Sequence, residues 1–254
     1  MTNYVAELAR LYAQQASIQS DAYLHAHSRN RAVIHRQVSI FERCQQYFKE
    51  ARTMLDWGCR QAVDACLVRM LRGGEIEIDA CDVDAAGYQV FFDFARLRYT
   101  ELTHPYMLPY PDNSFDVVMG SGVIEHVPHD SASLQELYRV IRPGGHCVIT
   151  MLPNKGSYTE FLNRTLGNAH HLRRYSLSQA KTMLLHHGFV PVRYGYHQVL
   201  PTLSSTQGGV FDRRSLNLLA EKVCGLNPFL ERLWPINLVS TNIFVVGRKV
   251  AVMP

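Results

Sequence analysis

The stretch Met54-Leu55-Asp56-Trp57-Gly58-Cys59-Arg60-Gln61-Ala62 decides the fold of this chain. Its first four residues read as a short strand, and residues 63–71 carry apolar side chains at helical spacing. Gly73 and Gly74 then end the predicted helix. The stretch therefore predicts a strand, a turn that contains Gly58, and a helix.

The same alternation of strand and helix continues along the chain. A third strand is expected near Leu102, although the pattern there does not place it. Ser133 and Glu136 have the spacing of a capping box, and Pro143-Gly144-Gly145 is predicted to end their helix. Repeated alternation implies a parallel sheet covered on both faces, which is an α/β, Rossmann-like, doubly wound fold. The other strands are predicted at 75–83, 115–119, 147–151, 190–199 and 241–248, and the helices at about 86–98, from Asp130, and from Ser176 to His187.

Two kinds of segment lie outside this alternation. Residues 1–52 are predicted to form an N-terminal helical cap, because apolar residues from Ile40 to Phe48 follow a helical pattern that leads into the first strand. Residues 53–254 form the main domain, with insertions at about 152–175 and 200–240 that exceed ordinary connection lengths. We expect these insertions to act as lids or substrate-binding segments. The second insertion carries a helical pattern at Leu216, Leu219, Ala220 and Val223.

Composition excludes several classes of protein. The 254 residues are 47% hydrophobic and 19% charged, which is ordinary for a globular chain and excludes disorder, collagen and coiled coil. The net charge of +4 is too weak for a committed nucleic-acid binder. The sequence has neither an apolar run long enough to span a bilayer nor a signal-peptide pattern at its start, so a cytoplasmic protein is expected. The oligomeric state stays open.

The cysteines and histidines do not form metal-binding spacings. The six cysteines include no Cys-x-x-Cys pair, and we expect them to be reduced and mostly buried. The histidine doublets at 170–171 and 186–187 have no partner at zinc-site spacing, so no metal site is predicted.

Three short stretches follow predicted strands and are candidates for a ligand site. In an open α/β sheet, ligands bind beyond the carboxyl ends of the strands, where Gly58, Asp82 and the stretch Gly120–Val127 are expected to lie. Taken singly, each has an ordinary structural explanation: Gly58 could make a tight turn, Asp82 could cap a helix, and His126 could be a core histidine. Their shared position at one end of the sheet favours a site.

Three motifs give the chain a family resemblance. Residues 108–118 (Leu-Pro-Tyr-Pro-Asp-Asn-Ser-Phe-Asp-Val-Val), 123–127 (Val-Ile-Glu-His-Val) and 137–145 (Leu-Tyr-Arg-Val-Ile-Arg-Pro-Gly-Gly) closely resemble the class I S-adenosylmethionine-dependent methyltransferases, most of all the small-molecule group called type 11. The resemblance covers residues 53–151 and extends to 199. It implies a seven-stranded sheet whose last strand, at 241–248, is antiparallel, and S-adenosyl-L-methionine as the cofactor.

The resemblance also assigns roles to matching positions. It implies that Asp56, Gly58 and Cys59 lie in the loop under the methionyl part of the cofactor. Asp82 would hold the ribose, Val83 would lie against the adenine, and Ser121 would lie along the cofactor after the fourth predicted strand.

The chain departs from the family in two places. Arg60 and Ala62 stand where the first loop of relatives commonly has glycine, and residues 103–107 lack the acidic residue that relatives often place near the adenine. Arg60 could pair with the cofactor carboxylate, with an anionic substrate, or with Asp64 on the next helical turn. These departures also admit a degenerate fold that only binds a partner. An oxidoreductase is disfavoured, because its Gly-x-Gly-x-x-Gly motif is missing.

The expected reaction is methyl transfer to a small molecule or glycan. A sulfonium methyl group is already activated, so the protein mainly aligns the reactants and excludes water. His126 is the first candidate for a general base at a hydroxyl acceptor, and His129 and the 170–171 doublet are weaker candidates. We expect O-methylation of a sugar-like hydroxyl, with a lipid or quinone acceptor as the second possibility because of the apolar residues at 229–234. An anionic acceptor would suit the arginines and tyrosines of the insertions, which are Tyr158, Arg164, Arg173, Arg174, Tyr175, Arg213 and Arg214.

Overall fold

The computed structural model describes residues 3–19, 22–84, 87–165, 167, 171, 173–202, 222–223 and 225–250. Three expectations from the sequence lie outside these residues. They are His170 of the first histidine doublet, the Arg213-Arg214 cluster, and the helical pattern that begins at Leu216.

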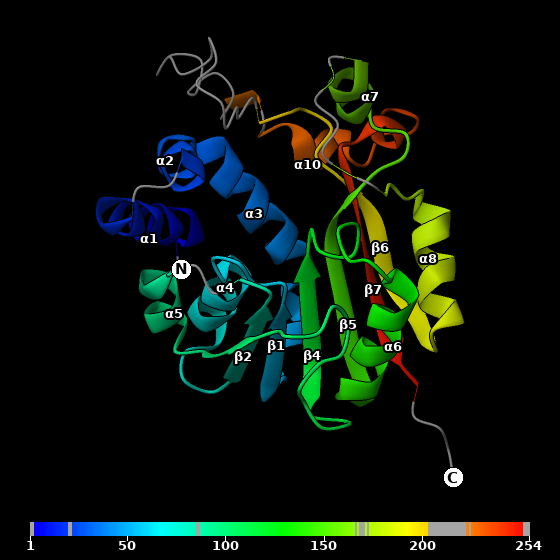
Figure 1. The fold of residues 1–254 in the computed structure, drawn as a ribbon. Coiled ribbons are helices and arrows are strands. Elements are labelled where there is room, and N and C mark those ends of the chain that lie inside the picture. Colours follow the sequence, from blue (N-terminus) through cyan, green and yellow to red (C-terminus); the bar gives the residue numbers. More distant parts are fainter. Residues whose placement is uncertain are drawn as a thin grey trace.

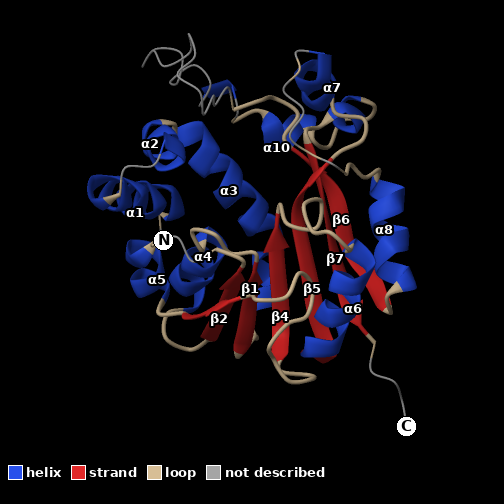
Figure 2. Ribbon diagram, in the orientation of Figure 1, coloured by secondary structure: helices blue, strands red, loops and turns tan. Residues whose placement is uncertain are grey.

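A seven-stranded sheet forms the centre of the molecule, with strand order β3-β2-β1-β4-β5-β7-β6 (Figure 2). β7 runs antiparallel to β5 and to β6, and all other neighbours are parallel. The predicted doubly wound sheet with an antiparallel last strand is therefore confirmed. The order reverses between β1 and β4, which is the place where such sheets bind ligands. The strands are β1 Thr53–Trp57, β2 Glu77–Asp82, β3 Arg98–Glu101, β4 Phe115–Ser121, β5 Ile141–Pro153, β6 Phe189–His197 and β7 Asn242–Lys249.

Helices cover both faces of the sheet (Figure 1). Successive residues of β1 enter opposite cores: Met54 packs with the N-terminal helices and α4, and Leu55 packs with α6 and α8. Both side chains are fully buried, which explains why apolar residues occupy successive positions at the centre of the strand. The helices are α1 Tyr4–Ile18, α2 Ala22–Arg29, α3 Arg31–Cys44, η1 Gln45–Phe48, α4 Val63–Arg72, α5 Gln89–Ala95, α6 Asp130–Val140, α7 Tyr158–Thr165, α8 Leu177–His186, α10 Asn227–Leu230 and η2 Ile236–Val239.

The third strand begins earlier than the sequence pattern suggested. Arg96 adopts a left-handed conformation with φ of 49°, which ends α5 and turns the chain directly into β3. The predicted helix to residue 98 is therefore too long, and the strand expected near Leu102 ends at Glu101. β3 is an edge strand without apolar alternation, and its Arg98 pairs with Asp79 of β2 at 2.7 Å. This edge position explains why hydrophobic periodicity does not reveal it.

One predicted helix cap is wrong and another is confirmed. Ser133 lies inside α6, which begins at Asp130, and Glu136 instead pairs with Arg139 at 2.8 Å. Ser176, by contrast, forms a capping box with Gln179 at the start of α8. α6 ends at Val140 and the chain enters β5 at once, so the predicted Pro143-Gly144-Gly145 stop falls within the strand.

The N-terminal helices belong to the packed core. Leu8, Leu11 and Phe41 are buried with residues of α4 and α5. Arg43 of α3 donates to Glu231 at 2.6 Å and to the carbonyl of Tyr196 at 2.8 Å, which joins the N-terminal segment to the last part of the chain. A boundary at residue 52 stays a prediction. The cysteines within the described residues, at 44, 59, 66, 81 and 147, are free and buried, as expected. Within the described part of the chain, no helix is both long and apolar enough to cross a membrane.

Candidate active site

The turn after β1 requires glycine at position 58. Gly58 has φ of 68°, and a Cβ atom built there would lie 2.5 Å from Cγ2 of Val123. Its N–H donates to the carbonyl of Cys81 at 2.8 Å, which holds the turn against the end of β2. Conformation and close packing both exclude a side chain at this position.

The rest of the loop keeps left-handed backbone without glycine. Arg60 has φ of 42° and Ala62 has φ of 56°, the two positions where the resemblance leads one to expect glycine. Such a conformation costs about 1–2 kcal/mol for a residue with a Cβ atom. Strain of this kind is typical of functional loops that the surrounding structure holds in place.

Two carboxylates hold this loop in place. The buried Asp56 accepts from the N–H of Ala65 in α4 at 3.1 Å, and burial raises the pKa of Asp56. Asp82 accepts from the N–H of Arg60 at 2.8 Å through Oδ2 and from the N–H of Val83 at 2.7 Å through Oδ1. A carboxylate has about four acceptor positions, so Asp82 retains capacity for ligand hydroxyls.

A cavity of about 550 Å³ opens at the carboxyl ends of β1 and β4. Among the predicted site residues, Asp56, Gly58, Cys59, Ser121 and His126 line it. Asp82 and Val83 are not among the lining residues, and Val83 is 65% exposed. The remaining walls carry residues that the sequence analysis did not assign to the site. They are mostly polar: Gln37 of α3, Thr159, Glu160 and Asn163 of α7, Gln198, Thr202, Thr241 and Asn242.

Gln61 is a further unpredicted lining residue. Its side chain is buried and its amide Nε2 has no hydrogen-bond partner among the described residues. A buried amide without a partner costs free energy, and a ligand carboxylate or hydroxyl in the cavity would satisfy it. No sequence pattern marks this residue, because its importance depends on its burial at the cavity wall.

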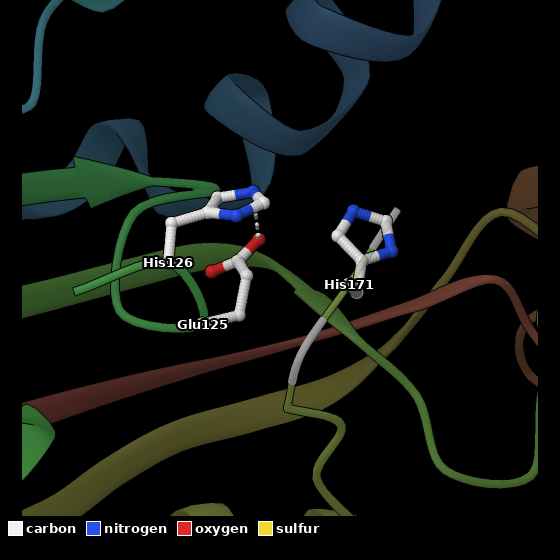
Figure 3. Close-up of side chains that lie close together, drawn as sticks. All are labelled: Glu125, His126 and His171. Carbon is white, nitrogen blue, oxygen red and sulfur yellow. Dashed lines mark ion pairs between the residues drawn. The ribbon is translucent and has the colours of Figure 1, made fainter. Parts of the chain in front are cut away.

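Four titratable side chains gather at the other end of the cavity. Glu125 and His126 follow β4, and His171 follows α7 (Figure 3). Nε2 of His126 lies 3.9 Å from Oε1 of Glu125, and Nδ1 of His171 lies 2.9 Å from Oε1 of Glu160. Burial raises the pKa of Glu125 to about 7 and lowers the pKa of His126, while the hydrogen bond to Glu160 raises the pKa of His171. The sequence analysis predicted His126 and named the doublet that contains His171.

Other predicted residues have structural positions. The guanidinium of Arg173 donates to the carbonyl of Pro128 at 2.8 Å and to that of Val127, which fixes the turn before α6. The ring of His129 packs edge-on against Tyr106, and His129 is not among the residues that line the cavity. Burial raises the pKa of the Cys59 thiol, so this thiol stays protonated and is no nucleophile.

The part of the chain that forms this loop and the strands around it is similar to proteins of known family. Residues 55–149, from β1 to β5, match the profile of a family described as "Methyltransferase domain". A probable S-adenosylmethionine-dependent methyltransferase of Mycolicibacterium smegmatis is 28% identical over 138 residues, which is 54% of this chain and 52% of the relative. Residues 55–149 therefore form a methyltransferase domain similar to that of S-adenosylmethionine-dependent methyltransferases. S-adenosyl-L-methionine is therefore the cofactor that this methyltransferase domain implies.

Other relatives share the same domain. A demethylmenaquinone methyltransferase of Streptomyces avermitilis is 36% identical over 99 residues, which cover 32% of this chain and 43% of that protein. The chain thus spans about half the length, or less, of the curated relatives it matches. A methyltransferase structure from Archaeoglobus fulgidus shares the fold with a TM-score of 0.60 at 21% identity and covers 90% of this chain and all of that chain.

The residues of this methyltransferase domain fit the cofactor. The glycine turn at Gly58 allows close approach of a ligand to the backbone, and the unpartnered amide of Gln61 supplies a donor inside the cavity. Asp82 supplies further acceptor capacity beside the same loop. Arg60 and Ala62 both have the left-handed backbone that glycine adopts most readily.

Proposed function

We propose that the chain transfers the methyl group of S-adenosyl-L-methionine to a hydroxyl of a small, polar, sugar-like molecule. One observation carries this proposal. A single cavity brings the loop after β1 together with Ser121, His126 and a wall of hydrogen-bonding side chains. The cofactor loop and an acceptor space therefore share one volume, as a direct transfer between two bound molecules requires.

The cofactor is proposed to lie across the carboxyl ends of β1, β2 and β4. Asp56, Gly58 and Cys59 would lie under its methionyl part, with Asp82 at the ribose hydroxyls and Val83 against the adenine. Ser121 would lie along the cofactor, and its hydroxyl accepts from Oγ1 of Thr150 at 2.9 Å. When bound, the cofactor supplies a methyl group on a positively charged sulfur.

The proposed chemistry is one displacement. The acceptor oxygen would form a bond to the methyl carbon as the bond from that carbon to sulfur breaks, which would leave a neutral thioether. The hydroxyl proton would leave to water at the exposed edge of His126. We propose His126 as the catalytic residue that contacts the acceptor oxygen, because it lines the cavity and its side chain is 51% exposed.

The cavity wall favours a polar acceptor. Side chains such as Gln37, Asn163 and Asn242 can donate to and accept from sugar hydroxyls. A quinone or lipid acceptor is the second candidate, favoured by the demethylmenaquinone methyltransferases among the relatives and by the exposed Phe229 and Trp234. A binding module without catalysis would show neither cofactor turnover nor an effect of His126. The expected cytoplasmic location stays a prediction.

Two measurements test the proposal. Calorimetric titration with S-adenosyl-L-methionine should show micromolar binding that Asp82→Ala abolishes, and no heat at millimolar cofactor would establish the binding module instead. A methyl-transfer screen should then give turnover on nucleotide sugars or glycan fragments and none on quinones. His126→Ala should lower kcat at least 100-fold with cofactor affinity unchanged, and unchanged kcat would remove His126 from the mechanism.

A further inference from the structure

The side chains of Glu125, His126 and His171 converge on one point at the acceptor end of the cavity. One ligand atom of each lies within 4.8 Å of those of the other two, and all three residues line the cavity (Figure 3). The ring centres of His126 and His171 are 5.5 Å apart. Atoms bound to one tetrahedral ion at about 2.1 Å each lie roughly 3.4 Å apart, so rotations of these side chains that move their ligand atoms by about 1 Å bring all three to a common ion.

Glu125 provides an independent indication that this cluster binds a cation. The residue is 1% exposed, and its Oε2 has no hydrogen-bond partner among the described residues. The 3.9 Å between its Oε1 and Nε2 of His126 is too long for a hydrogen bond and exceeds the separation of two tetrahedral ligands of one ion by only about 0.5 Å. A buried carboxylate without a partner is costly unless it is paired or binds a cation.

Glu160 lies outside the three-residue cluster and holds the ring of His171 in place. Nδ1 of His171 lies 2.9 Å from Oε1 of the buried Glu160, so a proton on Nδ1 donates to this carboxylate and leaves Nε2 to bind an ion. Metal-binding histidines almost always hold their second ring nitrogen in this way. Two imidazoles and one carboxylate from two segments of the chain, with a carboxylate behind one imidazole, make a built metal site rather than a surface cluster.

We propose that Glu125, His126 and His171 bind one divalent transition-metal ion at the acceptor end of the cavity. Two imidazoles and one carboxylate suit zinc and its first-row neighbours better than magnesium or calcium. The remaining coordination position faces the cavity and takes an oxygen of the acceptor. This role rests on the proposed function: the bound ion lowers the pKa of a coordinated hydroxyl, whose proton leaves to water, and His126 acts on the acceptor oxygen through the ion in place of direct contact.

Metal titration of the purified full chain tests the proposal without any methyl transfer. After removal of metals with a chelator, Co²⁺ should produce visible d–d absorption that saturates at one ion per chain, and Zn²⁺ should displace it. Glu125→Gln, His126→Ala and His171→Ala should each weaken Co²⁺ binding at least tenfold. His129→Ala is the matched control, because this histidine lies on the same turn but outside the cavity lining, and its Co²⁺ affinity should equal that of the wild type.

The outcomes separate this inference from the proposed function. Absence of a Co²⁺ band, or equal Co²⁺ affinity in all variants, overturns the metal site; if transfer persists without metal, His126 is left to act on the acceptor directly. Stoichiometric metal binding in a chain that does not bind S-adenosyl-L-methionine would uphold the site and refute the methyltransferase function. Circular dichroism spectra of Glu125→Gln, which preserves side-chain volume, show whether lost binding reflects lost ligands or lost structure.

Discussion

Alanine at position 58 should destabilise the protein through two separable effects. The left-handed φ of 68° costs about 1–2 kcal/mol once a Cβ atom is present. That Cβ would also lie 2.5 Å from Cγ2 and 2.7 Å from Cγ1 of Val123, an overlap that typically costs a further 1–3 kcal/mol, roughly. Gly58→Ala should therefore lower the free energy of unfolding by about 2–5 kcal/mol.

Urea-induced unfolding followed by circular dichroism measures both effects. Gly87→Ala is the matched control, because Gly87 has φ of 58° but a Cβ atom added there would meet nothing within 4 Å, so only the conformational cost of about 1–2 kcal/mol applies. Val123→Ala should remove the overlap. The double variant Gly58→Ala/Val123→Ala should therefore lose at least about 1 kcal/mol less unfolding free energy than the two single variants lose together. Equal losses in Gly58→Ala and Gly87→Ala, or additivity with Val123→Ala, would refute the packing argument.

Three further perturbations test other parts of the structure. Arg60→Gly should raise the free energy of unfolding by about 1 kcal/mol in urea titrations, because it relieves a left-handed residue; a loss of stability would show that the arginine side chain stabilises the loop. Burial alone would raise the pKa of Asp116, but hydrogen bonds to its carboxylate outweigh burial, so the pKa is lowered. The ionised carboxylate therefore stabilises the fold above roughly pH 4, and this stabilisation disappears as pH falls through the folded-state pKa. Thermal melts at several pH values should show a weaker loss of stability at acid pH for Asp116→Asn than for the wild type, and an equal loss would contradict the assignment. Glu231→Gln should lower the free energy of unfolding by about 2–4 kcal/mol in urea titrations, because it leaves the guanidinium of Arg43 without its buried carboxylate partner. Glu7→Gln removes the carboxylate of an exposed pair and should lower the free energy of unfolding by less than about 1 kcal/mol in the same assay.

The predictable part of the fold is the part that local patterns determine. β1, β4 and β7 are buried apolar runs, and the sequence locates them to within a few residues. The edge strand β3 has half-exposed polar residues and no such pattern. Ser133 has the spacing of a helix cap, but the helix starts at Asp130, since spacing alone does not reveal which turn of a helix is first.

The candidate site likewise has one part that local sequence predicts and another part that it does not. Asp56 and Gly58 belong to one strand–turn–helix unit, so their placement follows from local sequence. Glu160 and His171 meet Glu125 and His126 only because the segment after β5 folds back over the end of β4. Contacts between segments so distant in the sequence leave no periodic signal, so Glu160 could not be assigned to the site before the chain was folded. Gln61 lies in the local loop, but its importance depends on the burial of its amide, which the sequence does not reveal.

The proposed cofactor side and the proposed acceptor side of the cavity differ in their relation to the family match. The match ends at residue 149, and the loop after β1, Asp82 and Ser121 all lie within it. The walls proposed to face an acceptor come instead from α3, α7 and the residues around 198–202 and 241–242, all outside the matched region. Exchange of residues such as Gln37 or Asn163 should therefore change which acceptors are methylated while cofactor affinity stays constant. Glu125 and His126 lie within the match but His171 does not, so the proposed metal site joins the matched part of the cavity to the part outside the match.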